Sequence, residues 1–212
     1  MLKSYFRYLC HCLVAIAFSS ANAGPADDFF HAVNVDNPRT VSAMLAQGFD
    51  PNTVSEKGQV GLYLALRDGS PKVAAALLAS PRIVIDAPNA ADETPVMMAA
   101  LRGELDWTRK LLDRGALVNR PGWTPLHYAA AGPEAKVVAL LIERGADIEA
   151  LSPNRTTPLM MAARYGAEES ALLLLARGAK TQVRNDAGMN AIDFAKSAAR
   201  ESLARRLEQG SK

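Results

Sequence analysis

A short motif that begins with Thr-Pro recurs at an almost constant interval, and this repetition constrains the fold more than any other feature of the sequence. The complete copies are TPVM at residues 94–97, TPLH at 124–127 and TPLM at 157–160, and Ala-Ala follows each copy after one further residue. Weaker copies in the same frame are VGLY at 60–63 and NAID at 190–193. A repeat of about 33 residues predicts stacked units, because one such unit cannot bury its apolar side alone.

A second motif is linked to the first and marks the end of each unit. A pair of leucines, or a leucine and an isoleucine, precedes a glycine that lies 21 residues after the threonine, at Gly115, Gly145 and Gly178. A threonine hydroxyl can cap a helix start, and proline fits the first helical position because its missing N–H costs nothing there. Glycine permits the left-handed turn that stops a helix. Each unit is therefore predicted to contain two helices, with small alanines where neighbouring helices approach closely and leucines as the bulk of the core.

These two motifs resemble those of the ankyrin-repeat family, and the resemblance covers nearly all of the chain after residue 23. It implies an all-α fold, an ankyrin-repeat solenoid of about six helix-turn-helix modules with short β-hairpin-like loops. We expect an N-terminal capping ankyrin module at 24–57, internal ankyrin repeats at 58–187, a C-terminal capping repeat at 188–210 and a tail at 211–212. Terminal repeats need a polar outer face, because one of their sides meets water instead of a neighbour.

The first 23 residues have the pattern of a signal peptide. A basic start with Lys3 and Arg7 leads into an apolar run at 9–18, and small residues stand at Ala21 and Ala23. The alternative is an uncleaved membrane anchor, but a span needs roughly 20 apolar residues, and this run is about half that length. We therefore expect cleavage after Ala23 and export of a bacterial type to the periplasm, with secretion as the alternative location.

The charge of the chain limits the class of partner, and its cysteine content limits the chemistry of the mature protein. The chain has 24 Lys plus Arg against 22 Asp plus Glu, and removal of Lys3 and Arg7 leaves a formally neutral protein. Neutrality argues against a nucleic-acid or anionic-membrane binder, because both depend on clustered positive charge. Cys10 and Cys12 are the two cysteines of the chain, and both fall in the expected signal peptide. The mature protein would therefore contain neither a disulfide nor a thiol nucleophile.

The connection before the fourth module departs from the repeat. Gly115 and Thr124 are 9 residues apart, whereas the corresponding positions are 12 residues apart in the next two modules. Trp123 stands beside this deletion, at a position that the resemblance places against a bound partner, and tryptophan is a strong interface anchor. Alternatively, its indole fills the space that the missing residues leave. A second departure, Ser80-Pro81-Arg82 in place of a helix-ending glycine, is interpreted as an alternative helix stop.

The resemblance also implies where a partner would bind, namely the loop tips and the side formed by the first helix of each module. The candidate partner-binding residues at matching positions are Trp123, Arg67, Arg102, Arg164, Tyr165, Glu93, Asn154 and Met189. Three of them are arginines along one side, and arginine pairs well with carboxylates and aromatic rings at interfaces. The pattern favours an acidic or aromatic stripe on the partner. The alternative is a solvated face on which each arginine meets only water.

Few residues of the expected mature chain could perform catalysis. His31 and His127 are its histidines, and about three repeats separate them, which is too far for a shared metal ion or a proton relay. His127 resembles the family's structural histidine, which hydrogen-bonds between Thr124 and neighbouring backbone. The sequence contains no phosphate-binding glycine loop, nucleophile elbow or metal-ligand spacing. We therefore expect no enzyme activity, no cofactor and no metal site.

The sequence thus predicts a non-catalytic protein-protein interaction module, exported to the periplasm, that binds or scaffolds another protein through its concave face and loop tips. The alternative is a secreted effector, or an accessory subunit of an enzyme that acts outside the producing compartment. A rigid stack reduces the ordering cost of binding, which suits either role. We expect a monomer that binds neither nucleic acid nor membrane once the signal has been removed.

Overall fold

The computed structural model describes residues 24–210, so the predicted signal peptide at 1–23 and the predicted tail at 211–212 lie outside the described residues. The described chain forms twelve α-helices in six successive pairs. The first helices of the pairs are α1 (Pro25–Asn34), α3 (Gly61–Asp68), α5 (Pro95–Leu101), α7 (Pro125–Ala131), α9 (Pro158–Arg164) and α11 (Ala191–Ser197). The second helices are α2 (Pro38–Ala46), α4 (Pro71–Ala79), α6 (Leu105–Asp113), α8 (Ala135–Glu143), α10 (Glu168–Ala176) and α12 (Glu201–Gln209).

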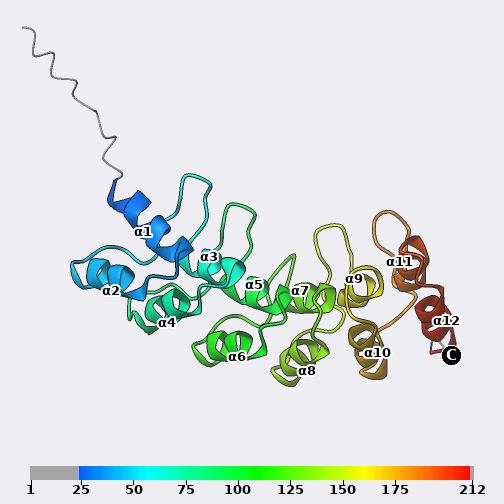
Figure 1. Ribbon diagram of the computed structural model, residues 1–212. Coiled ribbons are helices and arrows are strands. Elements are labelled where there is room, and N and C mark those ends of the chain that lie inside the picture. Colours follow the sequence, from blue (N-terminus) through cyan, green and yellow to red (C-terminus); the bar gives the residue numbers. More distant parts are fainter. Residues whose placement is uncertain (1–23, 211–212) are drawn as a thin grey trace, which may run out of the picture.

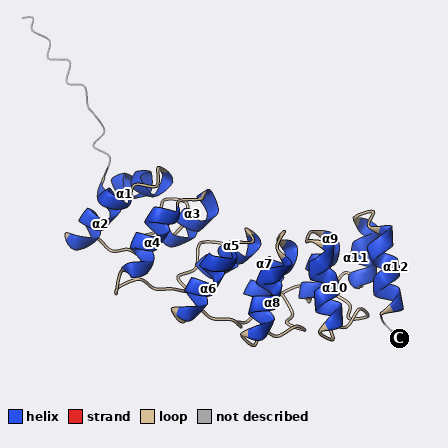
Figure 2. Cartoon of the chain, turned by 60° about the horizontal axis from the view of Figure 1, so that its bottom comes forward, coloured by secondary structure: helices blue, strands red, loops and turns tan. Residues whose placement is uncertain are grey.

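The helix pairs stack one after another into an elongated solenoid. Figure 1 shows the first helices as an upper row and the second helices as a lower row, running from the blue end to the red end of the chain. Each first helix packs against the first helices of the neighbouring pairs, as α7 does against α5 and α9. Figure 2 shows the same succession of pairs, with helices and loops but no strand in the part of the chain that is described. The predicted all-α repeat solenoid is confirmed.

The core follows the division into small and large residues that the sequence predicts. The paired alanines of α5, α7 and α9 are at most 1% exposed, which lets these first helices pack closely. Each second helix from α4 to α10 contributes one leucine with no exposed surface, and these are Leu77, Leu111, Leu141 and Leu174. The apolar surface of one pair is therefore covered by the next, and the core runs continuously along the stack.

The helix starts confirm the role of proline and correct part of the role given to threonine. Proline occupies the first turn of α5, α7 and α9. At α9 the Thr157 hydroxyl accepts the Met160 N–H at 3.3 Å, as expected of a cap. At α7 the Thr124 hydroxyl lies 2.9 Å from Nδ1 of His127 instead. Within residues 24–210 the Thr94 hydroxyl at α5 has no hydrogen-bond partner, although α5 and α7 both begin with the capping-box arrangement that the threonine motif predicts.

The helix stops agree with prediction. Gly115, Gly145 and Gly178 follow the second helices with φ between +86° and +93°, a conformation that favours glycine. The second module lacks such a glycine, and α4 ends at Ala79 as the alternative stop predicts. Arg82 then donates hydrogen bonds to carbonyls that follow or end α2, those of Leu45 at 3.2 Å, Gly48 at 3.2 Å and Phe49 at 2.7 Å. This departure thus links the second module to the first.

The loops that lead into the first helices are short turns, and no regular strand forms in the part of the chain that is described. Among the described residues, one isolated antiparallel bridge, between Val54 and Val60, represents β-structure. Four loops are each closed by a backbone N–H···O bond, from Ser55 to Gln59 at 2.8 Å, Asn89 to Glu93 at 2.9 Å, Ser152 to Thr156 at 3.0 Å and Asn185 to Met189 at 3.0 Å. The shortened loop at 116–123 forms no such bond within the described chain.

A series of side chains in the segments after the second helices joins each of the first four modules to the one that follows it. In each case a side-chain oxygen accepts a backbone N–H from the following module. The pairs are Asn52 with Val84 at 2.8 Å, Asp86 with Leu117 at 3.1 Å, Asn119 with Asp147 at 2.9 Å and Glu149 with Lys180 at 2.8 Å. These bonds fix the spacing between modules where helix packing alone would leave the loops unsupported.

Candidate partner-binding face

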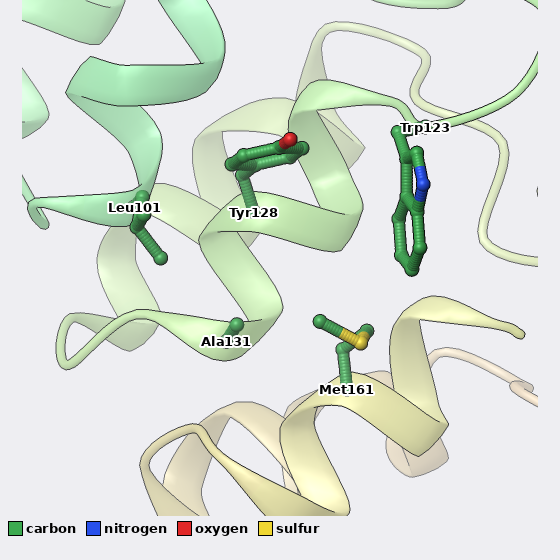
Figure 3. Close-up of a pocket in the computed structure, with 5 residues that line it drawn as sticks. All are labelled: Leu101, Trp123, Tyr128, Ala131 and Met161. Carbon is green, nitrogen blue, oxygen red and sulfur yellow. The ribbon is translucent and has the colours of Figure 1, made fainter. Parts of the chain in front are cut away.

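A pocket of about 220 Å³ opens on the face formed by the first helices, which we call the first-helix face. Its lining residues are Leu101 of α5, Tyr128 and Ala131 of α7, Met161 of α9, and Trp123 of the shortened loop. Figure 3 shows the Trp123 and Tyr128 rings on two sides of this space, with the Met161 thioether facing it from α9. The pocket therefore brings together three consecutive modules at the point where the sequence departs from its repeat.

The position of Trp123 is compatible with both of the interpretations that the sequence left open. Its half-buried indole packs edge-to-face on the His127 ring, with 5.2 Å between the ring centroids, and also lines the pocket. His127 is fixed in turn, because its Nδ1 accepts the Thr124 N–H at 3.2 Å and its Nε2 lies 2.9 Å from the Thr156 carbonyl. Burial lowers the pKa of His127, so the ring is neutral and Nε2 donates to that carbonyl. The predicted structural role of His127 is confirmed.

Tyr128, the wall opposite Trp123, is held by a carboxylate that spans three modules. Glu93 accepts a hydrogen bond from the Tyr63 hydroxyl of α3 at 2.5 Å and from the Tyr128 hydroxyl of α7 at 2.9 Å. The Asn89 side-chain amide donates to the same carboxylate at 2.8 Å. We call Glu93, Tyr63, Tyr128 and Asn89 the Glu93 cluster. Glu93, predicted as a partner contact at a loop tip, thus also ties α3 to α7 across its own module.

The Glu93 cluster shifts the acid–base properties of its members in opposite directions. Burial alone would raise the pKa of the Glu93 carboxyl, but the hydrogen bonds from Tyr63, Asn89 and Tyr128 lower it below its ordinary value. Burial, followed by the bond to Glu93, raises the pKa of both tyrosines. At neutral pH the cluster therefore contains one carboxylate and two neutral phenols. Each phenol can act as donor, which keeps the Tyr128 ring in a fixed orientation.

Arginines stand on both sides of the pocket along the stack. Arg102 directly follows Leu101 at the end of α5, and Arg164 lies one helical turn after Met161 at the end of α9. Both side chains are exposed, and within residues 24–210 no carboxylate forms an ion pair with either. Arg164 stacks over the Tyr165 ring at 5.2 Å. Arg164 also lies 5.9 Å from the Phe194 ring, so its guanidinium is held beside two aromatic rings while its side chain stays exposed.

The remaining predicted contacts lie farther from the pocket or take part in the fold. Arg67 on α3 forms a two-point ion pair with its neighbour Asp68 at 2.7 and 2.8 Å, so its charge is already compensated. Asn154 is exposed in the loop before α9, and its carbonyl accepts the Asp186 N–H at 3.1 Å, which joins two loop tips. Met189 is partly buried in the last loop. Of the predicted contacts, Trp123 thus lines the pocket, whereas Arg102, Arg164 and Tyr165 stand at the ends of the helices on either side of it.

Four of the five pocket residues were not among the predicted partner contacts: Leu101, Tyr128, Ala131 and Met161. Tyr128 and Met161 occupy the fourth position after the motif threonine, where the other modules place Leu64, Met98 and Phe194, all at most 7% exposed. Residue type alone therefore predicts a side chain that is buried in the core at this repeat position. The deletion before α7 was the available signal, because a shorter loop covers less of the helix that follows it.

Two further features of residues 24–210 bear on the site. No group of three or more His, Cys, Asp or Glu side chains in this part of the chain is arranged to hold a metal ion. Among the same residues, no helix has the length and apolar character needed to cross a membrane. The arrangement offers instead an apolar cavity with rigid aromatic walls and flanking positive charge.

Comparison with known proteins gives consistent matches along the chain. A family model described as ankyrin repeats in three copies matches residues 29–121 and 117–185. Ankyrin repeat and SOCS box protein 16 of Homo sapiens is 34% identical over 173 residues, which cover 76% of this chain and 38% of that protein. The nuclear factor NF-kappa-B p105 subunit of Gallus gallus is 29% identical over 161 residues, which cover 73% of this chain and 16% of that protein. The chain thus spans less than two fifths of the length of these relatives.

Proposed function

This chain belongs to the ankyrin-repeat family, and from that premise we propose that it is an exported module that binds a partner protein through its first-helix face and loop tips. Ankyrin repeats generally mediate protein–protein interaction. The observation that carries the proposal is the pocket between α5, α7 and α9, which a half-buried tryptophan lines and whose flanking helices α5 and α9 end at exposed arginines. Tryptophan, tyrosine and arginine are the residue types that most often supply the binding energy of an interface.

Rigidity supports the same proposal. The walls of the pocket are held by hydrogen bonds before any partner arrives, through Glu93 on one side and His127 on the other. A surface that is already ordered loses little conformational entropy on binding, so more of the contact energy appears as affinity. The curved stack presents this surface over several modules, which suits a protein partner better than a small molecule.

Affinity capture of binding proteins from a periplasmic extract tests the function. We expect Trp123→Ala to reduce recovery of the main partner about tenfold, because it removes the aromatic wall of the pocket. A variant with Arg67, Arg102 and Arg164 replaced by alanine should fold normally by circular dichroism and also lose recovery. The matched control replaces three exposed cations of the second helices by alanine, namely Lys72, Arg109 and Lys136. Equal recovery with all of these variants would place the binding surface elsewhere.

Export is the second part of the proposal and rests on the pattern of residues 1–23. Both cysteines of the chain fall in that segment, so a protein cleaved after Ala23 would have no thiol to oxidise outside the cytoplasm. Cell fractionation combined with N-terminal sequencing tests this part. We expect a periplasmic protein that starts at Gly24. A cytosolic protein that still starts at Met1 would contradict export, and recovery mainly from the culture medium would favour a secreted effector.

A further inference from the structure

We infer that the pocket receives one large apolar side chain from an extended, acidic segment of the partner, whose carboxylates meet Arg102 and Arg164 on either side. This inference rests on the proposed function and specifies the chemistry of the partner at that site. Four observations support it: the size of the pocket, the nature of its walls, the charges around it and the spacing between those charges.

The size of the pocket selects a single side chain. Its volume of about 220 Å³ falls below the range of about 300–1,000 Å³ that is common for small-molecule sites. The lining side chains are almost entirely apolar, from Leu101 and Ala131 to the Met161 thioether. An apolar side chain gains free energy by leaving water for such a space, whereas a polar one would lose its hydrogen bonds to water without replacement.

The walls combine two fixed rings with one adaptable side. Tyr128 is anchored through its hydroxyl to Glu93 at 2.9 Å, and Trp123 packs on the anchored His127 ring. Met161 is the flexible member, because an unbranched thioether chain adjusts its shape to what it contacts. The pocket can therefore accept leucine, methionine or phenylalanine without rearrangement of its aromatic walls.

The charges around the pocket favour an acidic segment. Arg102 and Arg164 are exposed, and within the described residues no carboxylate is paired with either. Glu93 contributes a negative charge beside Tyr128, but three donors already occupy its carboxylate. Arg67, by contrast, is compensated by Asp68. The cations left for a partner thus lie on both sides of the pocket, and a carboxylate can form two parallel hydrogen bonds with each guanidinium.

The spacing sets the length of the segment. Packed helices lie about 8–10 Å apart, so two steps from α5 over α7 to α9 span about 16–20 Å. In the extended polyproline II conformation a chain covers about 3.1 Å per residue and side chains three positions apart point to the same face, so about six residues separate the two carboxylates. The apolar side chain falls near the middle, above α7.

Synthetic peptides test the inference without knowledge of the natural partner. The probe is a fluorescein-labelled nonapeptide with leucine at its centre, aspartate three residues to either side, and glycine and serine elsewhere. Binding to the full mature chain is followed by fluorescence anisotropy. We expect replacement of leucine by glycine to weaken binding about tenfold or more, which corresponds to the loss of one buried side chain. Replacement of both aspartates by lysine should weaken it by a similar factor or more and reverse its dependence on salt, because attraction to the arginines becomes repulsion.

Variants of the protein separate the two contributions. Ala131→Leu fills the pocket and should make the leucine and glycine peptides bind equally. Arg102→Ala with Arg164→Ala should retain the preference for leucine but lose the preference for aspartate over lysine. Arg109→Ala, on α6, is the control and should change neither preference. In a Trp107→Phe background the remaining tryptophan, Trp123, should change its emission when the leucine peptide binds.

Each outcome bears on the inference in a definite way. Leucine-dependent and aspartate-dependent binding, both lost in the matching variants, supports it. Binding that does not depend on the leucine, or that does not depend on the aspartates, overturns the inference. Binding that leaves the Trp123 emission unchanged overturns it as well. If the peptides fail while Trp123→Ala still abolishes capture of a protein partner, the proposed function stands and this account of the partner is wrong. If the peptides fail and Trp123→Ala also leaves capture of the protein partner unaffected, the proposed function and this inference both fail.

Discussion

The side chain of Glu93 makes hydrogen bonds that reach across three modules. Tyr63 lies 30 positions before it and Tyr128 lies 35 positions after it, and both donate a hydrogen bond to its carboxylate. Hydrogen bonds to a charged acceptor are stronger than those between neutral groups, and a buried acceptor without its donors is costly. The Glu93 cluster should therefore stabilise the N-terminal half of the stack as well as shape the pocket.

Replacement of Glu93 by glutamine tests this role. The variant keeps the size of the side chain but turns one acceptor oxygen into a donor, which leaves one tyrosine hydroxyl or the Asn89 amide unpaired. We expect a loss of about 1–3 kcal/mol in the free energy of unfolding, measured by urea titration. Glu56→Gln, at an exposed loop position, is the control and should stay within about 0.5 kcal/mol of wild type. An equally small change for Glu93→Gln would mean that the cluster contributes nothing net to stability.

Acid should destabilise the protein in two separate ranges of pH. Burial lowers the pKa of His127 from its ordinary 6.5, so the unfolded chain takes up this proton first and stability falls as the pH drops below about 6.5. The hydrogen bonds to Glu93 lower its pKa from 4.5, so its contribution is present above that value and is lost at more acidic pH. Urea titrations at a series of pH values check both ranges. His127→Gln should flatten the first decline and leave the second, and identical profiles would contradict this assignment.

At the scale of elements, the loops between modules show what local sequence can and cannot determine. The helix stop at Gly115 and the helix start at Pro158 depend on neighbouring residues, so they could be predicted from the motif alone. The place of the pocket was indicated in part, because Trp123 adjoins the shortened loop. Its other walls were not, since Tyr128 and Met161 share a repeat position with buried residues. Their partial exposure is a property of how the modules pack, which residue type alone does not indicate.

The Glu93 cluster escaped prediction for a related reason. The contacts of Glu93 with Tyr63 and Tyr128 depend on the register in which three modules stack, and no residue near Glu93 in the sequence indicates that register. The same holds for Asn119, whose side chain accepts the Asp147 N–H at 2.9 Å and donates to the Gly145 carbonyl at 2.8 Å. Repetition predicts that modules touch, but not which side chains meet.

Asn119 therefore provides a test of the side-chain contacts between modules. Its side chain pairs one backbone donor, the Asp147 N–H, and one backbone acceptor, the Gly145 carbonyl. Asn119→Ala leaves both without this partner and should lower the free energy of unfolding by about 1–3 kcal/mol. Asn119→Asp keeps the acceptor and loses the donor, and should fall between alanine and wild type. Thermal unfolding followed by circular dichroism measures both. If aspartate proves as harmful as alanine, the bond to Gly145 is the more important of the two.

At the scale of the whole molecule, the hydrophobic core is spread along the stack and has no single centre. Each helix pair packs against its neighbours along the chain, so stability is approximately a sum of modules and of the interfaces between them. Two fully buried leucines stand at different places in this arrangement: Leu141 on α8 has a module on either side, whereas Leu207 on α12 belongs to the last module described. Loss of a terminal module costs one interface, but opening of an internal one costs two.

Alanine substitutions at these two leucines should therefore give different patterns of unfolding. Leu141→Ala is expected to cost about 2–5 kcal/mol and to lower hydrogen-exchange protection throughout α7 to α10, because both neighbouring interfaces lose their support. Leu207→Ala removes the same side chain, yet it should loosen α11 and α12 while protection in α5 to α9 stays near that of wild type. Leu117→Ala, at a leucine that is 53% exposed, is the control for the substitution itself. Equal loss of protection along the whole chain in both buried variants would show that the solenoid unfolds as one cooperative body, and that coupling between modules exceeds the nearest-neighbour contacts seen in the stack.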